Sequence, residues 1–132
     1  MDHINFLAVL VAAISSFLLG GLWYSPKLFG AAWNRENGST MKAGEGRHPA
    51  RVFGISLVCS LVSALAFAYI FGPAADISEA AIIGLLVGLC FVAMSFGINY
   101  QFANRSTLMW MIDGSYHTVQ FVLFGIIIGL WH

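Results

Sequence analysis

Four long apolar segments place the strongest limit on how this chain can fold. They cover residues 4–24, 52–71, 80–100 and 107–131 of a sequence of 132 residues. Each has about 20 to 25 residues, and a helix of that length, rising 1.5 Å per residue, crosses a hydrocarbon core of about 30 Å. Because backbone hydrogen bonds in lipid must be satisfied within each segment, we predict four transmembrane helices.

Composition supports lipid as the solvent for much of the surface. Hydrophobic residues make up 59% of the chain and charged residues only 9%, whereas soluble domains have about 25% charged residues. A net charge of zero gives a nucleic-acid partner no electrostatic attraction. The sequence therefore predicts an all-α integral membrane protein, a single domain over residues 1–132 folded as an antiparallel four-helix bundle in a lipid bilayer.

Lysine and arginine indicate the orientation in the membrane. All six lie in the first connection, residues 25–51, or in the third, residues 101–106, and none lies at the termini or in the second connection. The positive-inside rule places both basic connections in the cytoplasm and both termini outside. Within the first connection, residues 34–50 are polar, rich in glycine and without periodicity, so we predict a mobile loop there.

An aromatic corner follows the first apolar segment in the stretch "GLWYSPKLFGAAW", residues 21–33. Trp23 and Tyr24 suit the headgroup region, and Pro26 ends helical geometry at the preceding residue. Phe29 and Trp33 could lie along the interface in a short amphipathic turn. Two interpretations stay open: an interfacial aromatic belt with a helix stop, or a lid over a cavity between helices.

Polar residues interrupt the last apolar segment at helical spacing. Asp113, His117 and Gln120 fall on one stripe with Trp110, and Tyr116 borders it. An ionised Asp at membrane depth costs about 3 kcal/mol or more unless it is paired or hydrated, so such residues are functional candidates. The candidate ligand- or proton-binding residues are Asp113, Tyr116, His117, Gln120, Trp110 and, from the preceding segment, Asn99.

Several partners are open to Asp113. His117 lies one turn further along the helix and Arg105 lies near its start. Other segments offer polar side chains, namely Ser95, Asn99, Asn5, Ser15 and Ser16. The alternative to a functional site is a hydrogen-bond clamp that holds the last helix in the bundle. Asp113 and His117 could supply two metal ligands, but the other histidines do not obviously converge on them, so we expect no metal and no cofactor.

Small residues at four-residue spacing indicate close helix packing. Gly84 and Gly88 continue from Ala80 in the third segment, and Gly125 and Gly129 form a second pair in the fourth. They could pack the monomer only, or they could form the interface of a homodimer with two-fold symmetry. A bundle of four helices encloses little volume, which favours the homodimer for a transporter.

The stretches "GGLWYSPKLFGAAW" and "DGSYHTVQFVLFGIIIGLW" resemble the bacterial membrane-protein family called domain of unknown function 1761. The resemblance extends over nearly the whole chain. It rests on the order of the four segments, the Trp-Tyr-Ser-Pro corner, the following Phe-Gly-x-x-Trp and the Asp-Gly-x-Tyr-His run. It implies a multi-pass protein of the bacterial cytoplasmic (inner) membrane, and it implies no activity.

Three functions are compatible with these features. The first is a proton-coupled transporter or a membrane protein that binds a small apolar or cationic ligand on the Asp/Tyr/His face. The second is a structural or assembly protein whose polar face only clamps helices together. The third is a membrane-embedded enzyme acting on an apolar substrate, which the lack of a visible nucleophile–base pair makes the weakest of the three.

Overall fold

The computed structural model describes residues 4–38, 46–71 and 76–131. In these ranges every regular element is helical, and four helices are long and apolar enough to cross a membrane. The elements are α1 (Phe6–Trp23), α2 (Gly30–Asn37), α3 (Pro49–Phe71), α4 (Ile77–Leu86), η1 (Val87–Ala93), α5 (Met94–Phe102) and α6 (Thr107–Leu130). The predicted all-α fold with four membrane-spanning helices is confirmed.

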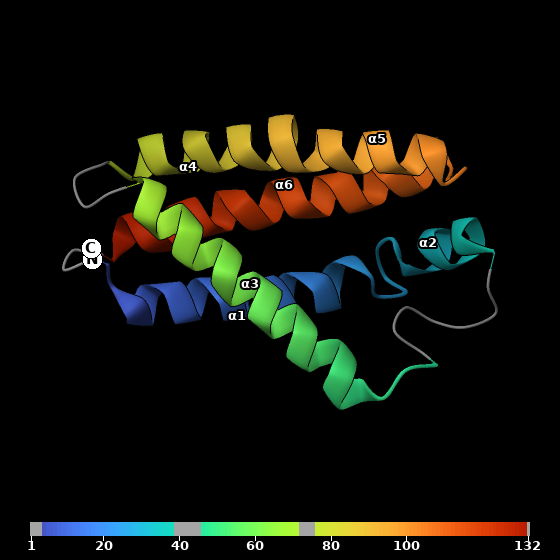
Figure 1. Ribbon diagram of the computed structural model, residues 1–132, viewed down its shortest axis with the longest axis horizontal. Coiled ribbons are helices and arrows are strands. Elements are labelled where there is room, and N and C mark those ends of the chain that lie inside the picture. Colours follow the sequence, from blue (N-terminus) through green and yellow to red (C-terminus); the bar gives the residue numbers. More distant parts are fainter. Residues whose placement is uncertain (1–3, 39–45, 72–75, 132) are drawn as a thin grey trace.

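Helix α6 lies between the other long helices (Figure 1). The continuous helix formed by α4, η1 and α5 runs antiparallel along one side of α6, and α1 runs antiparallel along the other. Helix α3 crosses α1 obliquely, so that its first half diverges from the bundle (Figure 1). The Asn5 side chain donates a hydrogen bond of 3.0 Å to the carbonyl oxygen of Trp131, which ties the start of α1 to the end of α6.

Two pairs of glycines bring α4 and α6 into backbone contact. A Cβ at Gly84 would lie 2.2 Å from the carbonyl oxygen of Phe121, and a Cβ at Gly125 would lie 2.2 Å from that of Ala80. Gly88 of the following segment η1 also faces α6, and Gly129 of α6 faces Ile77 and Ala80 of α4. All four glycines are thus covered within one chain. A homodimer stays a prediction, and it would need a surface other than these glycines.

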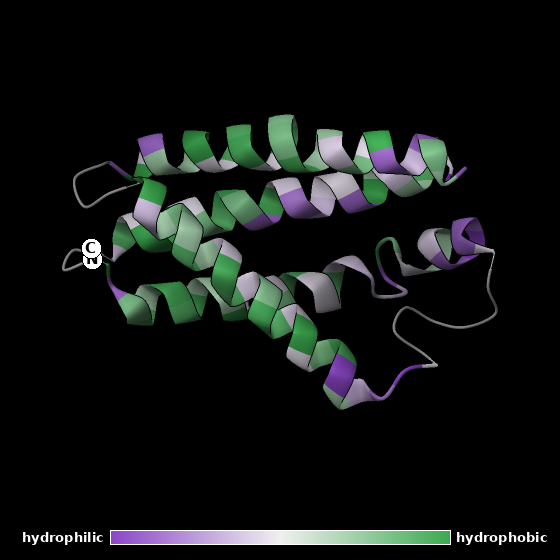
Figure 2. Cartoon of the chain, in the orientation of Figure 1, coloured by the Kyte–Doolittle hydropathy of each residue, from purple (hydrophilic) through white to green (hydrophobic). Residues whose placement is uncertain are grey.

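Hydrophobic residues make up most of the long helices, whereas hydrophilic residues occur on α2, at the start of α3 and in the middle of α6 (Figure 2). Helices α3 and α4 begin at Pro49 and Ile77, earlier than the predicted residues 52 and 80. Pro at the first helical position loses no hydrogen bond, because the N–H there would have no partner inside the helix. Hydropathy alone missed these polar first turns.

The predicted loop over residues 34–50 is wrong at both ends. Residues 34–37 belong to α2, and residues 49–50 belong to α3. Helix α2 ends at Asn37 and is capped by Gly38, whose φ of 67° lies in the left-handed region that suits a glycine cap. Residues 39–45 lie outside the described part of the chain.

Candidate functional site

The carboxyl group of Asp113 accepts hydrogen bonds from three aromatic side chains. The Tyr24 hydroxyl donates to Oδ1 at 2.6 Å, and the Tyr100 hydroxyl donates to Oδ2 at 2.6 Å. The Trp33 indole N–H lies 3.0 Å from Oδ1 and 3.2 Å from Oδ2. Asp113 is only 6% exposed. Both carboxyl oxygens therefore have aromatic hydrogen-bond partners.

A tight turn after α1 brings two of these donors to Asp113. The N–H of Gly30 donates to the carbonyl oxygen of Ser25 at 3.0 Å, and a Cβ at Gly30 would lie 2.2 Å from the carbonyl oxygen of Tyr24. Only glycine fits this reversal, which carries α2 back toward α6. The Trp23 indole N–H donates to the carbonyl oxygen of Ile112 at 3.0 Å and fixes the corner against α6.

Tyr24 lies one residue beyond the membrane-spanning part of α1. Burial, and after it the hydrogen bond to Asp113, raises the pKa of its hydroxyl well above the ordinary value of 10.0. The hydroxyl carries its proton at neutral pH, as an ordinary tyrosine does, and the raised pKa keeps it a donor to Asp113 in alkaline solution as well. We name this cluster of Asp113, Tyr24, Trp33 and Tyr100 the carboxylate clamp.

None of the partners predicted for Asp113 bonds to it. His117 bonds to Gln120, and Arg105 reaches Asn37 at 3.5 Å. Asn99 is exposed on α5. Of the serines and asparagine, Ser95 and Ser15 bond to backbone of their own helices, Ser16 to Ser60 and to its own helix, and Asn5 to Trp131. These predictions were wrong because they left out aromatic O–H and N–H donors, which come from Tyr24 and Trp33 in the aromatic corner and from Tyr100 in α5.

The aromatic corner is neither a simple belt nor a free interfacial turn. Trp33 points to Asp113 and does not lie along the interface as predicted. Phe29 packs on the Trp23 ring with centroids 5.0 Å apart, and it is 38% exposed. Pro26 is an exposed residue of the turn.

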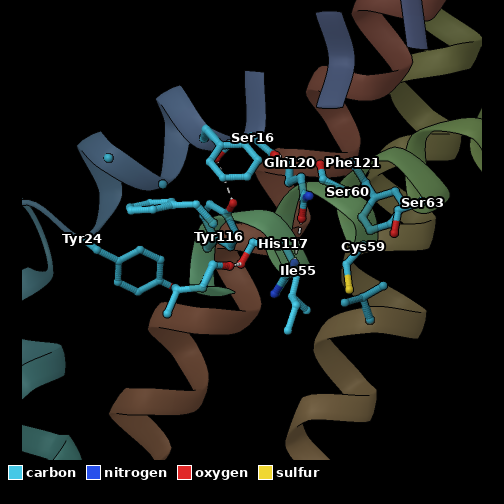
Figure 3. A pocket seen from close by; sticks show the side chains of 17 residues that line it. Ser16, Tyr24, Ile55, Cys59, Ser60, Ser63, Tyr116, His117, Gln120 and Phe121 are labelled. Atoms are coloured by element: carbon cyan, nitrogen blue, oxygen red, sulfur yellow. Dashed lines mark hydrogen bonds between the residues drawn. The ribbon is translucent and has the colours of Figure 1, made fainter. Parts of the chain in front are cut away.

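A pocket of about 600 Å³ lies between α1, α3 and α6 (Figure 3). Tyr24 and Tyr116 lie on one side of it, and Cys59 and Ser63 of α3 lie on the other (Figure 3). Its walls are mainly apolar or carry hydroxyl groups, and none of the described Asp, Glu, Lys or Arg residues lines it. The lining residues are Ser16, Phe17, Gly20, Gly21, Tyr24, Val52, Phe53, Ile55, Ser56, Cys59, Ser60, Ser63, Val92, Tyr116, His117, Gln120 and Phe121.

Three of the predicted site residues meet at this pocket. His117 Nδ1 lies 2.7 Å from Gln120 Oε1, and the His117 ring stacks on Phe96 with centroids 4.9 Å apart. The Tyr116 hydroxyl donates to the carbonyl oxygen of Ser16 at 2.9 Å. The predicted polar stripe therefore divides in two: Tyr116, His117 and Gln120 line the pocket, and Asp113 belongs to the carboxylate clamp.

Sequence reasoning missed the contribution of α3 to the site. Ser60 lies 2.8 Å from Ser16, joining α3 to α1, and Ser56, Cys59, Ser60 and Ser63 recur at helical spacing along the pocket. This run of small, weakly polar residues within an apolar segment was the signal that could have shown which face of α3 lines the pocket.

Trp110 serves the helix packing on another side of α6. Its indole N–H donates to the carbonyl oxygen of Ala93 at 2.8 Å, at the end of the π-helical segment η1. Its ring lies over Gly97, where a Cβ would come within 2.8 Å of it. Trp110 also lines a second pocket of about 470 Å³ together with Phe29. The predicted grouping of Trp110 with the other ligand-binding residues does not hold.

Replacing Trp110 by Phe is expected to lower the free energy of unfolding by about 1 kcal/mol, because the Ala93 carbonyl loses a donor where the backbone departs from α-helical bonding. Unfolding in mixed micelles would measure the loss. Trp131→Phe, at the exposed end of α6, is the matched control. Equal stabilities of the two variants would contradict a role for the indole N–H in holding η1.

Metal ligands do not gather in the described parts of the chain. No group of three or more His, Cys, Asp and Glu side chains there could hold an ion.

Comparison with known proteins gives one match. The model of a family described as "Protein of unknown function (DUF1761)" matches residues 7–129. No curated protein and no solved structure matches significantly.

Proposed function

We propose that this chain, which belongs to the DUF1761 family of proteins of unknown function, binds a small, mainly apolar molecule that enters from the bilayer. The pocket between α1, α3 and α6 is the site. The ligand-binding interpretation of the polar face is thereby preferred to proton-coupled transport on Asp113.

The pocket is the observation that carries the proposal. Its volume of about 600 Å³ lies in the range of about 300 to 1,000 Å³ that is common for small-molecule sites. Such sites combine apolar walls with a few polar groups that fix the orientation of the ligand. Here Phe17, Phe53 and Phe121 supply apolar walls, and His117 and Gln120 supply the polar groups.

The divergence of α3 supports entry from the lipid. Ser16 and Ser60 join α3 to α1 where the helices cross, and Ser60 Oγ also lies 3.2 Å from the Ala13 carbonyl oxygen. On the first half of α3, Phe53 and Ile55 line the pocket and are nevertheless 62% and 55% exposed. Exposed apolar residues at this depth meet acyl chains, so an apolar molecule can reach the pocket without crossing water.

The carboxylate clamp supports this site and does not itself bind the ligand. Tyr24 lines the pocket and donates to Asp113, so the clamp fixes one wall. A proton carrier needs a carboxyl group that exchanges protons with water or substrate. Asp113 is buried, and three donors occupy its oxygens, which favours a structural role for this residue.

The basic end of the molecule is proposed to face the cytoplasm of a bacterial cell. Arg35 in α2, Arg51 near the start of α3 and Arg105 after α5 all lie at that end (Figure 1). The contact of Arg105 with Asn37 brings the two basic connections together. The positive-inside rule then places Asn5 and Trp131, at the opposite end, on the outer side of the inner membrane.

Filling the pocket tests the proposal. Gly21 lines the pocket, and a Cβ there would meet nothing within 4 Å, so Gly21→Phe should fold and occupy the space. We expect it to remove saturable photolabelling by a diazirine derivative of dodecane in nanodiscs. Gly54→Phe is the matched control, because Gly54 also has nothing within 4 Å and does not line the pocket.

Two results would count against a binding pocket. One is labelling of the wild-type protein that rises linearly with probe and is not competed by unlabelled dodecane. The other is saturable labelling that persists unchanged in Gly21→Phe.

A further inference from the structure

We propose that the polar end of the ligand is a neutral oxygen group, a hydroxyl or a carbonyl, and that His117 and Gln120 hold it. This inference rests on the proposed function, since it concerns the same pocket, and it adds the chemical class of the molecule: a long-chain alcohol or ketone, with no charged head.

The hydrogen bond between the two side chains determines what they offer a ligand. Gln120 Oε1 can only accept, so the His117 Nδ1 that faces it at 2.7 Å carries the proton. In a neutral imidazole, Nε2 is then a free acceptor, and the amide nitrogen of Gln120 is a free donor. Neither nitrogen has a hydrogen-bond partner among the described residues.

Neither free nitrogen is completely buried. No fully buried side-chain nitrogen or oxygen in the described ranges lacks a partner, so an unpartnered atom must be open to a surface. His117 and Gln120 both line the pocket (Figure 3). Gln120 as a whole residue is only 6% exposed. The pocket therefore presents one donor and one acceptor on neighbouring side chains.

The presence of one free donor and one free acceptor does not depend on the orientation assigned to the Gln120 amide. If the Gln120 amide is rotated by half a turn, its N–H₂ donates to Nδ1, and the proton of the imidazole lies on Nε2. The free donor is then on His117 and the free acceptor is on Gln120. In both arrangements the pair can donate to a carbonyl or a hydroxyl and can accept from a hydroxyl.

The rest of the lining argues against a charged head. Within residues 4–38, 46–71 and 76–131, no Asp, Glu, Lys or Arg lines the pocket, so an ionic group would find no counter-charge among these residues, which is costly at membrane depth. The His117 ring is held between Phe96, with nearly parallel planes, and the edge of Tyr116, both at centroid distances of 4.9 Å. These aromatic contacts keep the polar pair oriented while the apolar walls take the chain of the ligand.

Competition against the dodecane photoprobe measures the preference for the head group. In nanodiscs of one neutral phospholipid, 1-dodecanol and 2-dodecanone should displace the probe at roughly five-fold lower mole fraction than dodecane, as one hydrogen bond of about 1 kcal/mol implies. Dodecyltrimethylammonium and dodecanoate should compete no better than dodecane. Equal competition by the alcohol, the ketone and the alkane, or stronger competition by a charged compound, would overturn the inference.

Variants assign the preference to the two side chains. Gln120→Met and His117→Phe keep the size and apolar contacts of each residue, so both should still take up the alkane probe while losing the five-fold preference. Ser115→Ala is the control, because it removes an exposed hydroxyl of α6 that does not line this pocket. A preference that survives in both pocket variants contradicts the assignment.

A measurement on the wild-type protein tests the head-group preference even if the variants fail to fold. With ¹⁵N-histidine labelling, 1-dodecanol should shift the Nε2 resonance of His117, whereas dodecane should not. An unshifted resonance at saturating alcohol overturns the head-group inference alone, provided that the alkane probe still labels saturably. Failure of the alkane probe itself would refute the binding pocket and the inference with it.

Discussion

Asp113→Leu is expected to lower the free energy of unfolding by about 3 kcal/mol, more than any other single polar substitution in the chain. The substitution leaves the hydroxyls of Tyr24 and Tyr100 and the indole N–H of Trp33 without their acceptor. All three groups come from different elements, so their loss separates the aromatic corner and α5 from α6. Unfolding in mixed micelles would measure the effect.

The conservative variant Asp113→Asn keeps the shape of the side chain and removes part of its capacity to accept hydrogen bonds, so it separates the two contributions to stability. The amide keeps one acceptor oxygen, so we expect about half the loss seen with leucine.

Tyr100→Phe, which removes one donor of the three, should cost about 1 kcal/mol. A cycle combining Tyr100→Phe with Asp113→Leu should show less than additive losses, because both remove the same bond. Additive losses, or an Asp113→Leu variant as stable as the wild type, would contradict the carboxylate clamp.

Gly84→Val and Gly125→Val are expected to destabilise the protein by about 3 kcal/mol or more each, because the added atoms meet backbone rather than a movable side chain. A Cβ at either position would lie 2.2 Å from a carbonyl oxygen of the facing helix. Helices α4 and α6 would have to separate, which breaks packing along their length.

The control for this prediction is Gly54→Val on α3. A Cβ there meets nothing within 4 Å, so the substitution should change stability by less than about 0.5 kcal/mol. Circular dichroism during thermal unfolding in detergent would compare the three variants. If valine at Gly84 or Gly125 were tolerated as well as at Gly54, the close approach of α4 and α6 would be refuted.

The four membrane helices could be predicted from the sequence because the cost of burying polar backbone in lipid leaves few alternatives. Close packing at Gly84 and Gly125 was also predicted from their spacing, although the sequence did not show which helix each would face. Helix α2 was predicted only as a short amphipathic turn containing Phe29 and Trp33, and its extension to Asn37 was missed. It is held in place by Trp33, whose contact with Asp113 spans 80 positions.

The candidate site was predicted only in part for a similar reason. Spacing along one helix placed Asp113, His117 and Gln120 on a common face, as one helix can show by itself. It could not show that the aromatic corner would form hydrogen bonds with Asp113, or that α3 would diverge and leave a pocket at His117 and Gln120. Both outcomes depend on contacts between segments far apart in the sequence, which periodicity does not encode.

Mapping the photolabel by mass spectrometry tests the ligand-binding pocket most directly. With the dodecane probe at saturation in wild-type protein, the crosslinks should fall on the pocket faces of α1, α3 and α6, around Gly21, Cys59 and Phe121. They should disappear from these positions in Gly21→Phe. Crosslinks that spread over lipid-facing residues such as Phe91 and Ile98, with no enrichment at the pocket, would contradict the account.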